Sequence, residues 1–243
     1  MKGPDLQEHM AGTYFSLRWG MAGIAFAFPL FLAIGGLIVD HEPLRGSMSA
    51  YYHSETLRDV FVGVLVAVGA CLYLYKGFST AENIALNLAG LFAVAIALVP
   101  TEWNCGDDCR TFTVHRVVGV LFFASIAYVS LFRASDTLSL IRDTERAKKF
   151  RVAYRTLGIA MVVSPVAAFI LAAILQPLTD GTSLVFFIEA FAVWMFAAYW
   201  FVKSREMAFT QAERLALETK LATADSEAVQ EDEIVGKVVQ LEP

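Results

Sequence analysis

The chain has 243 residues, of which 57% are hydrophobic and 18% charged, and 19 basic against 24 acidic residues give a formal net charge of −5. An average soluble domain is about 45–50% apolar and about 25% charged. The apolar residues arrive in blocks of about 20, which excludes a soluble single-domain enzyme. The composition also excludes a basic nucleic-acid-binding protein and a disulfide-rich secreted module.

Six apolar stretches are long enough to cross a hydrocarbon core of about 30 Å as helices. They are continuously apolar, whereas membrane strands alternate. No cleavable signal peptide is expected, because the first run is long and ends without an A-x-A-like site. The sequence predicts an all-α polytopic membrane bundle with six transmembrane helices. The predicted spans are residues 19–39, 57–75, 82–100, 113–133, 153–175 and 183–203.

The positions of Lys and Arg predict the orientation of the bundle. If the N-terminal segment 1–18 is cytoplasmic, only four of the 19 basic residues lie outside, and the basic connection 134–152 lies inside. We therefore expect both termini in the cytoplasm and a location in the bacterial inner (plasma) membrane. The expected partners are the lipid bilayer and, at the basic cluster 142–155, anionic lipid headgroups. No nucleic acid is expected, and the pattern leaves the oligomeric state open.

Two further segments and a cysteine pair lie outside the spans. Residues 204–224 are predicted to continue the last helix into the cytoplasm, and the acidic residues 225–243 to form a disordered tail. Cys105 and Cys109 fall in an outside loop, where an oxidising space favours a disulfide. Free thiols or a metal site are the alternatives for this pair.

Polar residues gather near the predicted outer face. Glu189 lies about 9 Å below the outer end of the last span and should face the bundle, because an ionised carboxylate in hydrocarbon is costly. His53, His115 and Glu189 have the donor atoms that zinc prefers, and three such ligands leave a position for an activated water. Asp59 is expected at the same depth. Ser49, four residues before His53, is placed to stabilise an oxyanion if that stretch is helical.

The Ser49-x-x-x-His53 spacing, followed by Asp59 at the head of a helix, resembles the serine, histidine and aspartate elements of the CREST membrane hydrolases. That group includes alkaline ceramidases and the progestin/adipoQ receptors, and the resemblance covers residues 49–65. It implies a zinc-dependent amide or ester hydrolase acting on lipid. The family has seven spans and a late His-x-x-x-His pair, for which Glu189 or His115 would have to substitute. The chain is also similar in outline to uncharacterised bacterial multi-pass membrane proteins, which implies no chemistry.

Three classes of function follow from these features. The first is a metal-assisted hydrolase of lipid or lipid-linked substrates, with Ser49, Asp59 and Glu189 as catalytic groups. The second is a proton-linked transporter or channel with Glu189 as the titrating carboxylate. The third is a non-catalytic assembly or scaffold protein, in which Asp59 and Glu189 pair with Arg58 or Arg116 and fix the register of the helices.

Overall fold

A computed structural model describes residues 3–102, 113–174, 183–212, 215 and 218–219. This part of the chain is helical and contains no strand. In chain order the elements are α1 (Gly3–Ile38), η1 (Ser49–His53), α2 (Leu57–Leu74), α3 (Thr80–Leu98), α4 (Val114–Tyr128), η3 (Val129–Arg133), η4 (Asp136–Leu140), α5 (Thr144–Ile174) and α7 (Leu184–Thr210). The segments η1 and η4 are 3-10 helices, and η3 is a π-helical turn that continues α4.

Six of the helices are long and apolar enough to cross a membrane, which confirms the predicted six-helix architecture. The bounds of α2 and α3 lie within two residues of the predicted spans. In contrast, α1, α5 and α7 extend well beyond the predicted spans at the end where the basic residues lie. The reason is that backbone hydrogen bonding continues through charged residues, whereas a hydropathy window stops at them.

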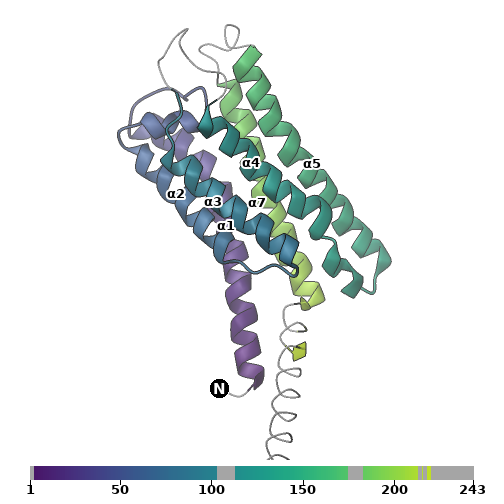
Figure 1. The fold of residues 1–243 in the computed structure, drawn as a ribbon. Coiled ribbons are helices and arrows are strands. Elements are labelled where there is room, and N and C mark those ends of the chain that lie inside the picture. Colours follow the sequence, from purple (N-terminus) through teal and green to yellow (C-terminus); the bar gives the residue numbers. More distant parts are fainter. Residues whose placement is uncertain (1–2, 103–112, 175–182, 213–214, 216–217, 220–243) are drawn as a thin grey trace, which may run out of the picture.

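The helices pack in a closed ring, in the order α1, α2, α3, α4, α5, α7 and back to α1 (Figure 1). α3 lies between α2 and α4 with a face of small residues, of which Ala85, Ala89 and Ala93 are buried. Small side chains let helix backbones approach closely in a membrane protein. The contact is closest at Gly69 of α2 and Gly90 of α3, where an added Cβ on Gly90 would meet the Gly69 carbonyl oxygen at 2.6 Å.

The N-terminal end of α1 and the C-terminal end of α7 lie at the same end of the bundle (Figure 1). We call this the inner end and the opposite one the outer end, following the predicted orientation. η1 belongs to the outer end. The inner end holds the α2–α3 turn and the short helices that connect α4 to α5.

Candidate functional site

At the outer end, Glu189 of α7 holds the connection between α1 and α2. Its carboxylate accepts a hydrogen bond from the backbone N–H of Met48 at 2.6 Å and a second one from the N–H of Ser49. The carbonyl of Gly46 accepts a hydrogen bond from the N–H of Phe186, 2.9 Å away. Glu189 is partly buried, and Arg116 of α4 is near enough for its charge to act on it. Two main-chain donors and a nearby guanidinium thus stabilise the charge of this carboxylate.

The two candidate histidines are both bonded to the chain that leaves α3. His53, exposed at the end of η1, contacts the Thr101 carbonyl oxygen through Nε2 at 2.7 Å. His115, buried in the first turn of α4, contacts the Val99 carbonyl oxygen through Nδ1 at 2.7 Å. A carbonyl only accepts, so each of these ring nitrogens donates its proton. The two rings are close enough to interact electrostatically.

Of the two other candidate catalytic residues, Ser49 lies beside Glu189 and Asp59 does not. Ser49, at the start of η1, shares a hydrogen bond of 3.2 Å with Ser47 and lies directly beside Glu189 through its N–H. Asp59 lies in the first turn of α2, where its side chain is exposed and makes no ion pair or hydrogen bond with another described residue. The structure therefore brings Ser49 and Glu189 together but joins neither to Asp59.

The rest of the outer loop is held by Tyr51 and Arg45. The Tyr51 ring is 1% exposed and packs against Gly36 of α1, where a Cβ would lie 3.0 Å from its hydroxyl. Burial raises the pKa of the Tyr51 hydroxyl above its ordinary value, so the group stays protonated. Arg45 donates to the Ala50 carbonyl at 3.1 Å, pairs with Glu42 at 2.6 Å and lies over the Tyr51 ring. The loop has one defined shape.

The predicted metal and disulfide remain predictions. In the parts of the chain that the structure describes, no group of three or more His, Cys, Asp or Glu side chains is placed to hold a metal ion. Cys105 and Cys109 lie outside the described residues, and Cys71 is a free thiol in α2.

A second polar cluster, buried at the inner end, was not anticipated from the sequence. Lys203 and Glu206 of α7 are 2% and 0% exposed, and their Nζ and Oε2 atoms are 2.7 Å apart. Lys203 also donates to Thr137 Oγ1 at 2.9 Å and to the Ala134 carbonyl at 3.2 Å, which uses all three ammonium protons. Glu206 accepts further bonds from Thr137 at 2.6 Å and from the Tyr154 hydroxyl at 2.7 Å.

Two more charged side chains are buried next to this pair. Arg18 of α1 is 1% exposed and donates to the Tyr75 hydroxyl at 3.3 Å. Glu82 of α3 is 3% exposed, accepts from the N–H of Phe78 at 2.8 Å, and lies within electrostatic range of Lys203. We call the four charges with their hydroxyl partners the inner charge cluster: Arg18, Tyr75, Glu82, Thr137, Tyr154, Lys203 and Glu206. Its residues come from α1, α3, α5, α7, η4 and the C-cap of α2, and its formal charges sum to zero.

The position of Lys203 corrects one element of the sequence analysis. The pattern placed the end of the last span at residue 203 and counted Lys203 among the cytoplasmic basic residues, but α7 runs to Thr210 and buries this side chain. Gln211 then adopts a left-handed conformation, with φ of 48°, that ends the helix. The signal for the pair was its spacing: Lys203 and Glu206 are three residues apart and therefore adjacent on a helix.

The fold and these two sites define a class of molecule: a multi-pass helical membrane protein with ionisable groups inside the bundle. Comparison with family models, with curated proteins and with solved structures finds no match for the chain. We therefore infer a function from the chemistry of the chain's own residues.

Proposed function

We propose that this protein moves protons, or a solute coupled to protons, across the bacterial inner membrane. The observation that carries the proposal is the Lys203–Glu206 pair, which is fully buried on a membrane-spanning helix. Ionisable residues within membrane helices are costly, and they mark ion pathways and proton relays by default. In this proposal the Glu206 carboxylate, which accepts from two hydroxyls and an ammonium, is the proton-carrying group at the inner end.

Two features argue against a purely structural pair. Apolar residues of similar volume usually replace a buried ion pair without loss of stability, so packing alone does not require these charges. The indole N–H of Trp200, one turn of α7 away from Lys203, is buried and has no hydrogen-bond partner among the described residues. A buried donor of this kind suits a bridging water or a polar solute.

The second carboxylate of α7 lies at the opposite end of the bundle. Glu189 and Glu206 are about 17 residues apart, which is roughly 25 Å along a helix that rises 1.5 Å per residue. One membrane-spanning helix thus carries a carboxylate near each end. A proton taken up at one end and released at the other is the simplest use of this arrangement, with both termini of the chain in the cytoplasm.

The test is proton flux into liposomes that contain the purified full-length chain, a pH-sensitive dye inside and a potassium diffusion potential. The wild type should acidify the interior faster than protein-free liposomes. Glu189→Gln and Glu206→Gln should each reduce the rate at least tenfold, because an amide does not titrate. Asp59→Asn removes an exposed carboxylate of the outer end and should leave the rate unchanged.

Wild-type flux equal to that of empty liposomes would exclude the proposal, in favour of a non-catalytic assembly role. Wild-type rates in both glutamine variants would exclude the carboxylates of α7 as its titrating groups. Thermal unfolding in detergent checks that each variant is folded before its rate is compared.

A metal-assisted lipid hydrolase at the outer end is the second candidate. The bonds from His53 and His115 to main-chain carbonyls favour it, because zinc-binding histidines are oriented by such a bond from the nitrogen that does not bind the metal. The proposed ligands are these two imidazoles and the Glu189 carboxylate. They would have to move together to hold the ion, because in the described part of the chain no three such side chains are placed to do so. The ion would supply an activated water next to Ser49. Stoichiometric zinc that disappears in a His53→Ala/His115→Ala variant would support this candidate, and a zinc-free wild type would exclude it.

A further inference from the structure

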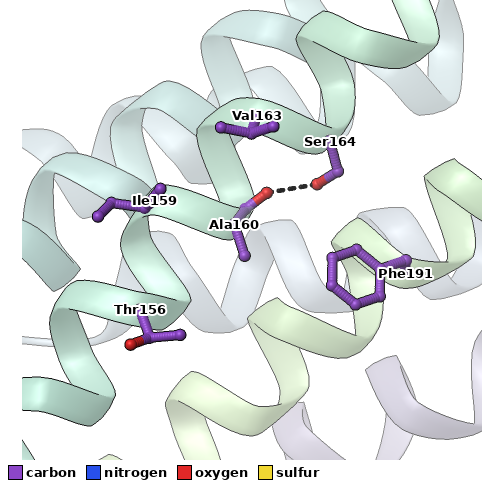
Figure 2. A pocket seen from close by; sticks show the side chains of 6 residues that line it. All are labelled: Thr156, Ile159, Ala160, Val163, Ser164 and Phe191. Atoms are coloured by element: carbon purple, nitrogen blue, oxygen red, sulfur yellow. Dashed lines mark hydrogen bonds between the residues drawn. The ribbon is translucent and has the colours of Figure 1, made fainter.

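An open groove runs between α5 and α7 on the outside of the bundle (Figure 2). Its volume is about 500 Å³. The lining consists of Thr156, Ile159, Ala160, Val163 and Ser164 of α5 with Phe191 of α7. The Ser164 hydroxyl turns back onto the Ala160 carbonyl at 2.5 Å, so it offers little polarity to the groove. The surface is apolar and lies on two membrane-spanning helices.

Basic residues continue the same face of α5 towards the inner end. Lys149 precedes Thr156 by seven residues, about two helical turns, so the two lie on one face of the helix. Arg146 lies one turn further and is adjacent to Lys149. Its guanidinium stacks on Phe209 of α7 at 4.5 Å, which places it at the same α5–α7 seam as the groove.

The charge on this face is largely uncompensated. Lys148 and Lys149 are exposed and make no ion pair with another described residue. The Arg146 guanidinium makes one ion pair, with the Asp143 carboxylate at 3.8 Å, and both of these side chains are about half exposed. An exposed pair at that distance neutralises little charge. The seam therefore presents a positive end followed by an apolar channel.

We propose that this seam binds one anionic phospholipid, with its phosphate at Arg146 and Lys149 and one acyl chain in the α5–α7 groove. A phospholipid of the inner leaflet has the same order of charge and apolar chain along the membrane normal. Basic pockets between membrane helices bind anionic headgroups in this way. If a second copy of the chain covered this seam instead, it would have to bring acidic groups to Lys148, Lys149 and Arg146. The proposed lipid site does not depend on the proposed proton transport.

Native mass spectrometry of the full chain in detergent tests the site directly. Phosphatidylglycerol and phosphatidylcholine with identical acyl chains are added in separate samples. We expect at least fivefold more retained phosphatidylglycerol than phosphatidylcholine on the wild type. Arg146→Gln/Lys149→Gln should lower retained phosphatidylglycerol to the phosphatidylcholine level, and Ala160→Trp, which fills the groove, should lower retention of both lipids.

The matched control is Arg142→Gln/Arg151→Gln, which removes the same charge from exposed positions nearby. Arg151 faces away from the groove, about 140° around the helix from Thr156. This control should retain phosphatidylglycerol like the wild type. Equal loss in the control, or no preference between the two lipids, overturns the proposal. Displacement of the lipid by inorganic phosphate alone, or a dimer that persists after delipidation, also overturns it. If Ala160→Trp fails to fold, the two charge variants decide the outcome.

Discussion

Lys203 is the residue whose environment says most about this protein. Its ammonium group is enclosed by α7, by α5 and by the segment between α4 and α5, and every proton has an acceptor. Such a network is stable only when it is complete, because a buried charge without its partner pays the full desolvation penalty. The Lys203–Glu206 pair therefore joins α7 to α5 and to the segment between α4 and α5.

At this scale we predict that Glu206→Ala strongly destabilises the protein. The substitution leaves the Lys203 ammonium buried without its carboxylate, and the loss should be about 3–5 kcal/mol in the free energy of unfolding. Thermal unfolding of the purified protein in detergent measures it.

The control for that measurement is the double variant Lys203→Met/Glu206→Leu, which replaces both charges by apolar side chains of similar size. It should unfold at a higher temperature than Glu206→Ala but below the wild type, since no unpaired Lys203 ammonium remains while the Thr137 and Tyr154 hydroxyls lose their acceptor. The same double variant should have lost proton flux. A Glu206→Ala variant as stable as the wild type would contradict this description of the pair.

The sequence led to Glu189 but not to Glu206, and the difference is physical. Glu189 is a lone carboxylate within an apolar run, which is conspicuous by its solvation cost. Lys203 and Glu206 follow an apolar run, where charged residues usually belong to a loop, and their hydroxyl and carbonyl partners come from distant segments. The hydrogen bond from the Met48 N–H to Glu189 could not be predicted either, because nearly every residue type has the same main-chain donor.

At the scale of the helical element, the α2–α3 contact depends on two glycines. A Cβ on Gly69 would meet the Gly90 carbonyl oxygen at 2.8 Å, and the reciprocal contact of Gly90 is shorter still. Both obstacles are backbone atoms, which move only if a helix moves. Ala85, Ala89 and Ala93 recur at a four-residue spacing on one face of α3, and all three are buried.

We expect Gly90→Ala to separate α2 from α3 and to cost about 1–3 kcal/mol, the usual range for overpacking. The midpoint of thermal unfolding should fall accordingly. Gly63→Ala, on the same helix pair, adds a Cβ with nothing within 4 Å and should be neutral or slightly stabilising. Equal destabilisation by both substitutions would mean that helix propensity, and not the close approach, explains the loss.

The short helices at the inner end show where sequence patterns stop being informative. Hydropathy predicted one span over 113–133, and α4 with the π-helical turn η3 occupies residues 114–133. The pattern did not show that the last turn is π-helical or that the 3-10 helix η4 follows it. Ser130 in the π turn donates to the Tyr154 carbonyl at 2.8 Å, and this tertiary bond belongs to α5. This hydrogen bond between two segments fits the π-helical turn, and the periodicity of neighbouring residues does not predict such a bond.

For the whole molecule, six spans were predictable because apolar length alone decides them. The side of the membrane on which the inner end lies is a prediction from the positions of Lys and Arg. In a cysteine-free background, a membrane-impermeant maleimide on intact cells should label Thr56→Cys at the outer end. It should label Ser139→Cys at the inner end only after the cells are broken. Both positions are exposed in the structure. The opposite pattern would reverse the orientation.

The helices of the ring differ markedly in length, and this has a consequence for the membrane itself. α2 and α3 have 18 and 19 residues, about 27–28 Å at 1.5 Å per residue, whereas α5 has 31. An average hydrocarbon core is about 30 Å thick, so the bilayer must thin beside the short pair. The turn between these short helices contains Tyr75 and precedes Glu82. Both residues belong to the inner charge cluster, so the turn lies beside this cluster. Bilayer thickness therefore sets how far this cluster lies from water. Under the proposed function, the lipid composition of the host membrane would then affect how readily its carboxylates exchange protons.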